Sequence, residues 1–155
     1  MKVERRILLP ATPEACWTVL TDWERQADWM RDADRVDVLS EHREGIGVLV
    51  AVRTRVYNVP VFTERLEVTA WEPPHRLQIT HRSAIKGTGD WLLQPFVGGT
   101  RFTWVEDVEL PLGALGRLAF RVYRPFLRHL MGGTMQDLRG ALRAAGATAG
   151  PGGPH

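Results

Sequence analysis

Hydrophobic and polar residues alternate along most of the chain between residues 2 and 110. Because successive side chains of a β-strand point to opposite faces, alternation of period two predicts strands. Short links containing glycine or proline separate them, which indicates hairpins and an antiparallel sheet. The predicted strands cover residues 2–10, 35–42, 48–56, 61–72, 76–83, 90–97 and 101–110.

Three stretches have a helical pattern instead. Residues 11–22 predict a short helix with Thr12 as its N-cap and Pro13 at its first position, and residues 23–30 predict a second short helical piece. From residue 113 to residue 145, apolar residues recur every three or four positions, which predicts one long helix that Pro125 should kink. Its apolar stripe must be buried against one face of the sheet. The predicted fold class is therefore α+β, with a curved antiparallel sheet of about seven strands wrapped around a long C-terminal helix.

The chain length of 155 residues suits one domain, which we expect over residues 1–145. The last ten residues, 146–155, have the sequence GATAGPGGPH. Such a Gly/Pro-rich composition is typical of a flexible tail.

Composition and charge exclude several classes of function. The formal net charge is only +2, and no basic run is interleaved with aromatic residues, so we expect no nucleic-acid partner. Cys16 is the only cysteine, no Cys/His cluster has zinc-ligand spacing, and no Gly-rich phosphate loop is present, so we expect neither a metal nor a cofactor. We find no signal-peptide pattern and no run of about 18 apolar residues, so we expect a cytoplasmic protein without an integral membrane segment. The oligomeric state stays open.

A histidine lies on the apolar face of one predicted strand. In LQITHRS, residues 77–83, period two places His81 on the same face as Leu77 and Ile79. The same pattern places Glu64 and Glu106 on the inward faces of their strands. A carboxylate on an apolar face costs free energy unless it is paired or in contact with water. A histidine near two carboxylates could act as a general base, with one carboxylate orienting it or raising its pKa.

The turns allow the register between these strands to be predicted. The glycine turn after residue 97 should pair Val97 with Thr100, which sets Trp91 opposite Glu106 and Leu93 opposite Trp104. The IKGTG segment, residues 85–89, should be a loop that pairs Ser83 with Gly89, which sets His81 opposite Trp91. The EPPH turn, residues 72–75, should pair Ala70 with Leu77, which sets Leu66 opposite His81. One row would then contain Leu66, His81, Trp91 and Glu106, with Glu64 one step diagonally from His81 and about 10 Å between the Cβ atoms of His81 and Glu106.

The inward-facing residues of the predicted strands and of the long helix define a mostly apolar pocket with a few polar groups. This is the usual composition of a small-molecule site. The candidate catalytic residues are His81, Glu64 and Glu106. The alternative is that His81 is a hydrogen-bonded wall residue and that the tryptophans only pack the core. The candidate ligand-binding residues are Thr54, Phe62, Leu66, Ile79, Trp91, Leu93, Phe102, Trp104, Val122, Phe126 and Leu130.

Several segments together resemble a known superfamily. They are ILLPATPEACWTVLTDWERQADWM, the EGIG turn, WEPPHRL, GGTRFTWVEDVELP and the long terminal helix. Over residues 2–143, their order and spacing resemble the SRPBCC superfamily of START-like and birch-pollen-allergen-like proteins. The polyketide cyclase/dehydrase-like branch is the most similar. The resemblance implies a helix-grip fold, an SRPBCC-like ligand-binding domain, and a cavity for a hydrophobic small molecule between the sheet and the long helix.

The resemblance leaves three functions open, because one fold serves many activities. The first is a carrier or sensor that binds a lipid, a polyketide or another aromatic or isoprenoid compound. The second is a polyketide cyclase/aromatase or dehydratase that uses His81 with Glu64 or Glu106. The third is a protein-interaction module. The IKGTG segment could also gate the cavity, since glycine permits motion.

Overall fold

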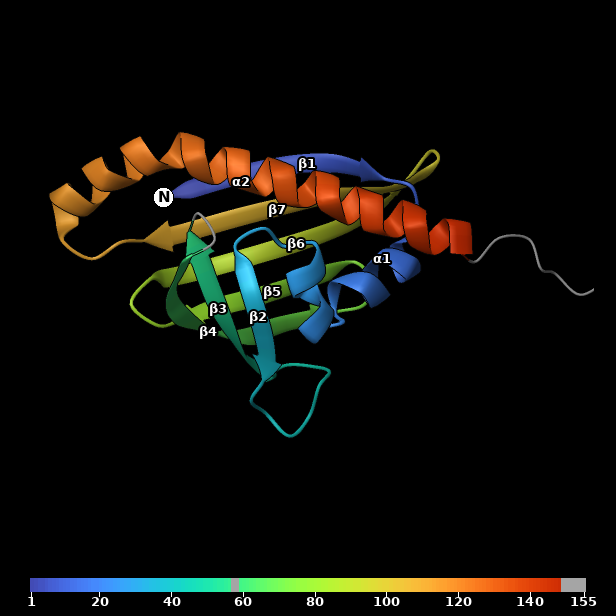
Figure 1. Ribbon diagram of the computed structural model, residues 1–155, viewed down its shortest axis with the longest axis horizontal. Helices are drawn as coiled ribbons and strands as arrows, with labels where there is room; N and C mark the ends of the chain where they lie inside the picture. The colour runs from blue at the N-terminus through green and yellow to red at the C-terminus, as the bar shows by residue number, and fades with distance from the viewer. Residues whose placement is uncertain (57–58, 149–155) are drawn as a thin grey trace, which may run out of the picture.

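The protein is described by a computed structural model, which covers residues 1–56 and 59–148 (Figure 1). Seven strands and one long helix form an α+β helix-grip fold, which confirms the predicted fold class. The short helices after the first strand are α1 (Pro13–Leu20) and the 3-10 helix η1 (Glu24–Asp28). The strands are β1 (Lys2–Leu9), β2 (Ala33–Val38), β3 (Leu49–Val56), β4 (Val59–Glu72), β5 (Arg76–Arg82), β6 (Lys86–Phe96) and β7 (Gly99–Glu109), and the long helix is α2 (Gly113–Thr148).

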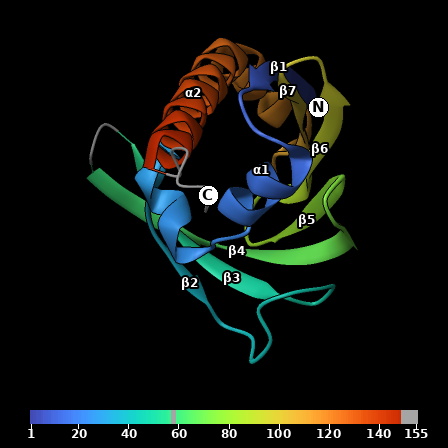
Figure 2. The same ribbon diagram turned by 90° about the vertical axis from the view of Figure 1, so that its right-hand side faces the viewer.

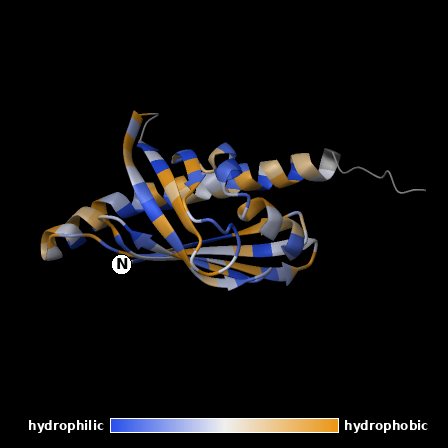
Figure 3. Cartoon of the chain, turned by 90° about the horizontal axis from the view of Figure 1, so that it is seen from below, coloured by the Kyte–Doolittle hydropathy of each residue, from blue (hydrophilic) through white to orange (hydrophobic). Residues whose placement is uncertain are grey.

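The strands form one antiparallel sheet in the order β1-β7-β6-β5-β4-β3-β2. The sheet curves around an interior, and α2 crosses its concave side, while α1 and η1 lie near one end (Figure 2). Hydrophobic and hydrophilic residues alternate along the strands in Figure 3, as a sheet with one buried face requires.

Sequence explains why α1 begins where it does. The Thr12 hydroxyl accepts a hydrogen bond of 3.2 Å from the backbone N–H of Ala15, and Pro13 opens the helix. A side-chain oxygen at this position satisfies one of the backbone donors that an α-helix leaves unpaired at its start. Cys16, Trp17 and Leu20 then face the core.

The long helix α2 has two parts with different surroundings. Its C-terminal part buries Met131, Met135, Leu138 and Leu142 among the core residues. In its N-terminal part only Gly116 and Phe120 are buried, while Leu118 and Val122 are more than half exposed. The helix runs through Pro125 as one arched element (Figure 1).

The helix extends to Thr148, so residues 146–148, the start of the expected flexible tail, are helical. The rest of that predicted tail, residues 149–155, lies outside the described residues. Within the described part of the chain, no helix is long and apolar enough to cross a membrane.

The register agrees with the prediction on one side of β5 and differs on the other. Leu66 lies opposite His81 as expected, although a bulge at residue 69 pairs Leu77 with Trp71 instead of Ala70. The prediction for the next hairpin was wrong: β6 begins at Lys86, so IKGTG is mainly strand rather than a gating loop. His81 therefore lies opposite Gly87 instead of Trp91.

The hairpin between β6 and β7 is also shifted from its predicted register. Phe96 pairs with Gly99, which places Gly89 opposite Glu106 and Trp91 opposite Trp104, whereas the prediction set Trp91 opposite Glu106. Leu93 lies opposite Phe102 rather than Trp104. Both shifts are by an even number of residues, so the inward-facing set is retained while the neighbours across the strands change.

Candidate functional site

Two adjoining hollows lie inside the curve of the sheet. One, of about 140 Å³, extends toward the N-terminal part of α2, and the other, of about 100 Å³, extends toward η1. An engineered apolar cavity of about 150 Å³ holds one benzene molecule, so a ligand of one or two rings could occupy this space. The two hollows have six lining residues in common: Asp32, Thr54, Glu64, His81, Trp104 and Glu106.

His81 is held between two carboxylates at the centre of this shared wall. Its Nδ1 atom lies 2.5 Å from Oε1 of Glu64, and its Nε2 atom lies 3.2 Å from Oε2 of Glu106. The three side chains are only 10–14% exposed. The Nε1–H group of Trp104 donates a hydrogen bond of 2.7 Å to the other oxygen of Glu106. We call His81, Glu64 and Glu106 the histidine clamp.

Glycine makes the clamp possible, because β6 lies between the strands that carry His81 and Glu106. On β6, Gly87 lies opposite His81 and Gly89 lies opposite Glu106. A Cβ atom on Gly89 would lie 2.8 Å from Oε1 of Glu106 and 3.2 Å from its Cδ atom. The Glu106 carboxylate therefore occupies the space that a side chain at position 89 would fill, and from there it reaches His81.

The clamp determines the charge of His81. Burial alone would lower the pKa of this imidazole, but the hydrogen bonds and negative charges of Glu106 and Glu64 outweigh burial and raise its pKa to about 10. His81 is therefore an imidazolium at neutral pH, with both N–H groups donated to carboxylates. In this state it cannot accept a proton, so the predicted role of His81 as a general base does not follow from the geometry.

The two carboxylates of the clamp differ in what they can still bind. Both oxygens of Glu106 accept hydrogen bonds, from His81 and from Trp104. Glu64 uses Oε1 for His81, and within the described residues no hydrogen bond reaches its Oε2 atom. All three residues of the clamp line both hollows, and Glu64 is the one whose carboxylate keeps an oxygen available to accept a hydrogen bond or a proton from a ligand.

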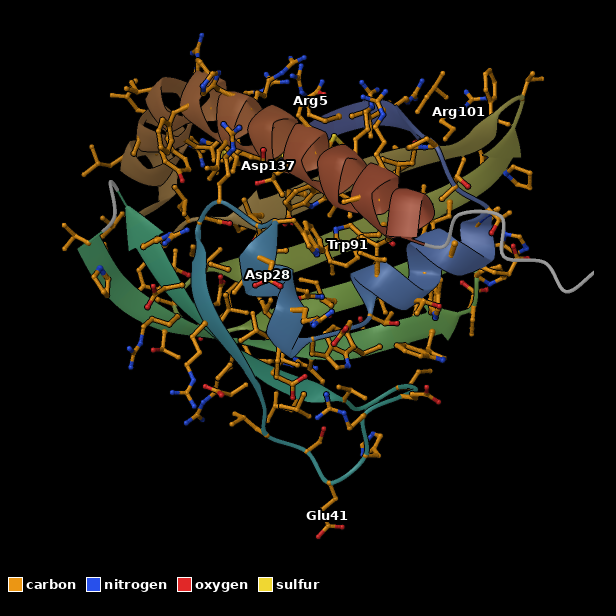
Figure 4. All side chains as sticks on the ribbon, turned by 45° about the vertical axis from the view of Figure 1, so that its right-hand side comes forward. Arg5, Asp28, Glu41, Trp91, Arg101 and Asp137 are labelled. Atoms are coloured by element: carbon orange, nitrogen blue, oxygen red, sulfur yellow. The ribbon has the colours of Figure 1, made fainter. Side chains whose placement is uncertain are left out.

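Most of the predicted ligand-binding residues do line the hollows. Thr54 and Trp104 line both, Phe62 and Leu130 line the larger one, and Leu66, Ile79 and Trp91 line the smaller one. Trp91 lies in the interior between α2 and the sheet (Figure 4) and packs edge-on against Trp104, with 6.1 Å between the ring centroids. Their role in binding stays a prediction.

The other four candidates line neither hollow, and their role in binding also stays a prediction. Leu93 and Phe102 are 1% exposed core residues that line neither hollow, although Phe102 packs edge-on against Trp91 behind the wall of the smaller one. Val122 and Phe126 line neither hollow, and Val122 is 77% exposed. Helical spacing alone does not give the rotation of a helix about its axis, and it is the neighbouring residues Tyr123 and Leu127 that line the larger hollow.

Sequence reasoning missed Asp32, the third carboxyl group of the site. It lies between η1 and β2 in a stretch without clear periodicity, so no pattern gave its orientation. The backbone N–H of Arg55 on β3 donates a hydrogen bond of 2.9 Å to the Asp32 carbonyl, which fixes the segment against the sheet. Oδ1 of Asp32 is buried without a hydrogen-bond partner among the described residues.

Burial raises the pKa of the Asp32 carboxyl. The negative charges of Glu106 and Glu64 raise it further, while a hydrogen bond from its own backbone N–H and the charge of Arg55 lower it. The net direction is upward, which favours the neutral acid.

Comparisons with solved structures support the fold. The chain is similar to the Zhui aromatase/cyclase from a Streptomyces species, with a TM-score of 0.79 and 15% identity over 97% of this chain and 98% of that one. A protein from Thermus thermophilus matches with a TM-score of 0.77 and 18% identity, over 94% of this chain and 99% of that one. The di-domain ARO/CYC StfQ from the steffimycin biosynthetic pathway matches with a TM-score of 0.76 and 14% identity, over 94% of this chain and 51% of that one. At these identities the likeness shows the fold alone.

Comparisons by sequence give the family. Among proteins of curated function, none matches the chain. The family model described as polyketide cyclase / dehydrase and lipid transport matches residues 1–146, which confirms the resemblance found in the sequence. Because the match covers nearly the whole chain, the protein belongs to the polyketide cyclase / dehydrase and lipid transport family.

Proposed function

We propose that residues 1–145 form one unit that binds a hydrophobic small molecule, as a carrier or sensor, in the two hollows around the histidine clamp. The observation that carries this proposal is the composition of the wall, where aromatic and aliphatic side chains surround a few buried polar groups. Such a wall removes apolar ligand surface from water and orients the ligand through its polar atoms. A cytoplasmic location stays a prediction from the sequence.

A matched pair of variants tests where the ligand binds. Thr54 lines both hollows, so Thr54→Trp would fill the space with an indole. Thr63 is the exposed residue after Phe62 on β4, so Thr63→Trp adds the same side chain outside the cavity. The probe is 6-propionyl-2-(dimethylamino)naphthalene, an uncharged two-ring dye whose emission shifts to shorter wavelength in apolar sites.

The proposal expects the dye to bind the wild type and the Thr63→Trp variant with similar affinity, and the Thr54→Trp variant at least tenfold more weakly. Circular dichroism confirms that each variant is folded. Equal binding by all three proteins would contradict a site in the hollows.

A second candidate function is acid–base catalysis beside a carbonyl group, as a cyclase or dehydratase requires. The observation that favours it is the carboxylate of Glu64, which lines both hollows beside an imidazolium and whose Oε2 atom receives no hydrogen bond from the described residues. In this version Glu64, rather than His81, removes the proton from the ligand carbon. The C–H bond breaks, its proton moves to Glu64, and its electron pair forms the enolate.

Hydrogen exchange tests this second function without knowledge of the natural substrate. In D₂O, the methyl protons of 2-acetonaphthone would exchange faster with the wild-type protein than with buffer, as followed by proton NMR. Glu64→Gln should remove the acceleration, whereas Glu67→Gln, on the same strand and paired with Arg82, should retain it. Exchange at the buffer rate with the wild type, or full acceleration with Glu64→Gln, would refute the catalytic role of Glu64.

A further inference from the structure

The lining of the two hollows has an unbalanced set of charges. It contains the carboxyl groups of Asp32, Glu64 and Glu106, and its only cationic group is His81, since no lysine or arginine lines either hollow. The clamp of one imidazolium and two carboxylates carries a net negative charge. A ligand carboxylate, sulfonate or phosphate would lose its hydration here, and the one cation of the lining, His81, already donates both of its N–H groups to carboxylates.

Asp32 is the one acid in this wall that the clamp does not engage. Its Oδ1 atom is buried and has no hydrogen-bond partner among the described residues, although the residue lines both hollows. An ionised carboxylate with an unpaired buried oxygen is costly, whereas the protonated acid is an O–H donor. The charged groups around Asp32 also favour its neutral form. The carboxylates of Glu106 and Glu64 oppose ionisation of Asp32, and the charge of Arg55 favours that ionisation less strongly.

We propose that Asp32 is a specificity-determining residue. Its carboxyl group donates an O–H hydrogen bond to an oxygen atom of the ligand. The surrounding wall admits uncharged ligands and rejects anions. This rests on the proposed ligand-binding function and gives it a ligand class. The ligand is an uncharged apolar molecule that carries an acceptor oxygen, such as a ketone. Glu64, through Oε2, would accept a hydrogen bond from a hydroxyl elsewhere on the same molecule.

Three probes with the same ring system separate the contributions to binding. 2-Acetonaphthone carries the acceptor oxygen, 2-ethylnaphthalene has a similar shape without it, and 2-naphthoate replaces the methyl ketone with a carboxylate of similar size. Binding is measured by quenching of tryptophan fluorescence at pH 7, where 2-naphthoate is ionised. The wild type should bind the ketone about three- to tenfold more tightly than the hydrocarbon, the range expected for one buried hydrogen bond. It should bind the anion at least tenfold more weakly than the ketone.

Variants of Asp32 then identify the donor. Asp32→Ala should remove the advantage of the ketone over the hydrocarbon. Asp32→Asn should retain most of it, because the amide is also neutral and donates a hydrogen bond. Asp37→Ala, in which an exposed carboxylate of β2 is lost, is the control and should bind like the wild type. A ketone advantage that survives in Asp32→Ala, or a 2-naphthoate affinity equal to that of the ketone, would overturn the proposal.

Failure of the underlying function has a different signature. If none of the three probes bound the wild type, the ligand-binding function itself would be refuted, together with the role of Asp32. If the probes bound but 2-naphthoate was preferred, ligand binding would stand and only the inferred ligand class would fail.

Discussion

The histidine clamp predicts that the free energy of unfolding falls as the pH rises from 7 to 9. The pKa of His81 is raised from its ordinary value of 6.5 to about 10 in the folded protein, so the folded state holds a proton that the unfolded state has released in this range. For a group whose pKa is raised by folding, the stabilisation is fully present when the pH is below the pKa of the group in the unfolded state. It is lost as the pH rises through the pKa of the group in the folded state.

The size of this effect follows from the shift. One pKa unit corresponds to about 1.4 kcal/mol, so the protonated clamp contributes on the order of 4 kcal/mol at pH 7, and about 2–3 kcal/mol of that is lost by pH 9. The clamp is only 10–14% exposed, so solvent screens it little.

Urea unfolding at pH 7, 8 and 9 measures the effect, with His81→Gln as the reference. The variant cannot titrate at this position, so the difference between the two pH slopes isolates His81 from all other groups. We expect the wild type to lose stability more steeply with pH than the variant. Equal slopes in the two proteins would refute the assignment of a retained proton to His81.

Three further predictions concern individual residues. Gly89→Ala should displace the Glu106 carboxylate from His81 and so lower the pKa of this histidine, which NMR titration of the imidazole ring measures. The control is Gly140→Ala on α2, where a Cβ atom meets open space, and it should leave the pKa of His81 unchanged. Thr12→Ala should lower the free energy of unfolding by about 1 kcal/mol through loss of the α1 cap; no change in the urea midpoint would contradict that role. Leu138→Ala should cost about 2–5 kcal/mol, since the Leu138 side chain of α2 is fully buried in the core, and a loss below 1 kcal/mol in the same assay would contradict its place there.

Periodicity predicted which side chains of the sheet face inward, because that property depends only on the parity of the register. The predicted partner of His81 was Trp91, and the observed partner is Gly87, four residues away on β6. An even shift keeps the same face, so His81, Glu64 and Glu106 still meet inside the sheet. Their direct contact could not be foreseen, because it depends on glycine, rather than tryptophan, lying between His81 and Glu106.

Two other features lay beyond sequence reasoning for different reasons. Asp32 follows η1 in a stretch with neither helical nor strand periodicity, and its orientation is set by contacts with β3. The rotation of α2 depends on how its buried C-terminal part packs against the sheet, so the pattern in the N-terminal part could not distinguish Tyr123 from Val122 as the inward residue.

The central claim is that an uncharged hydrophobic ligand binds inside the sheet, around the histidine clamp. NMR titration of ¹⁵N-labelled protein with 2-acetonaphthone tests it most directly, with the tryptophan indole signals as reporters. The account predicts that the signals of Trp91 and Trp104 shift on binding, while that of Trp17, which lines neither hollow, changes little. Shifts confined to the exposed apolar side of α2 around Val122, with unchanged Trp91 and Trp104 signals, would contradict it.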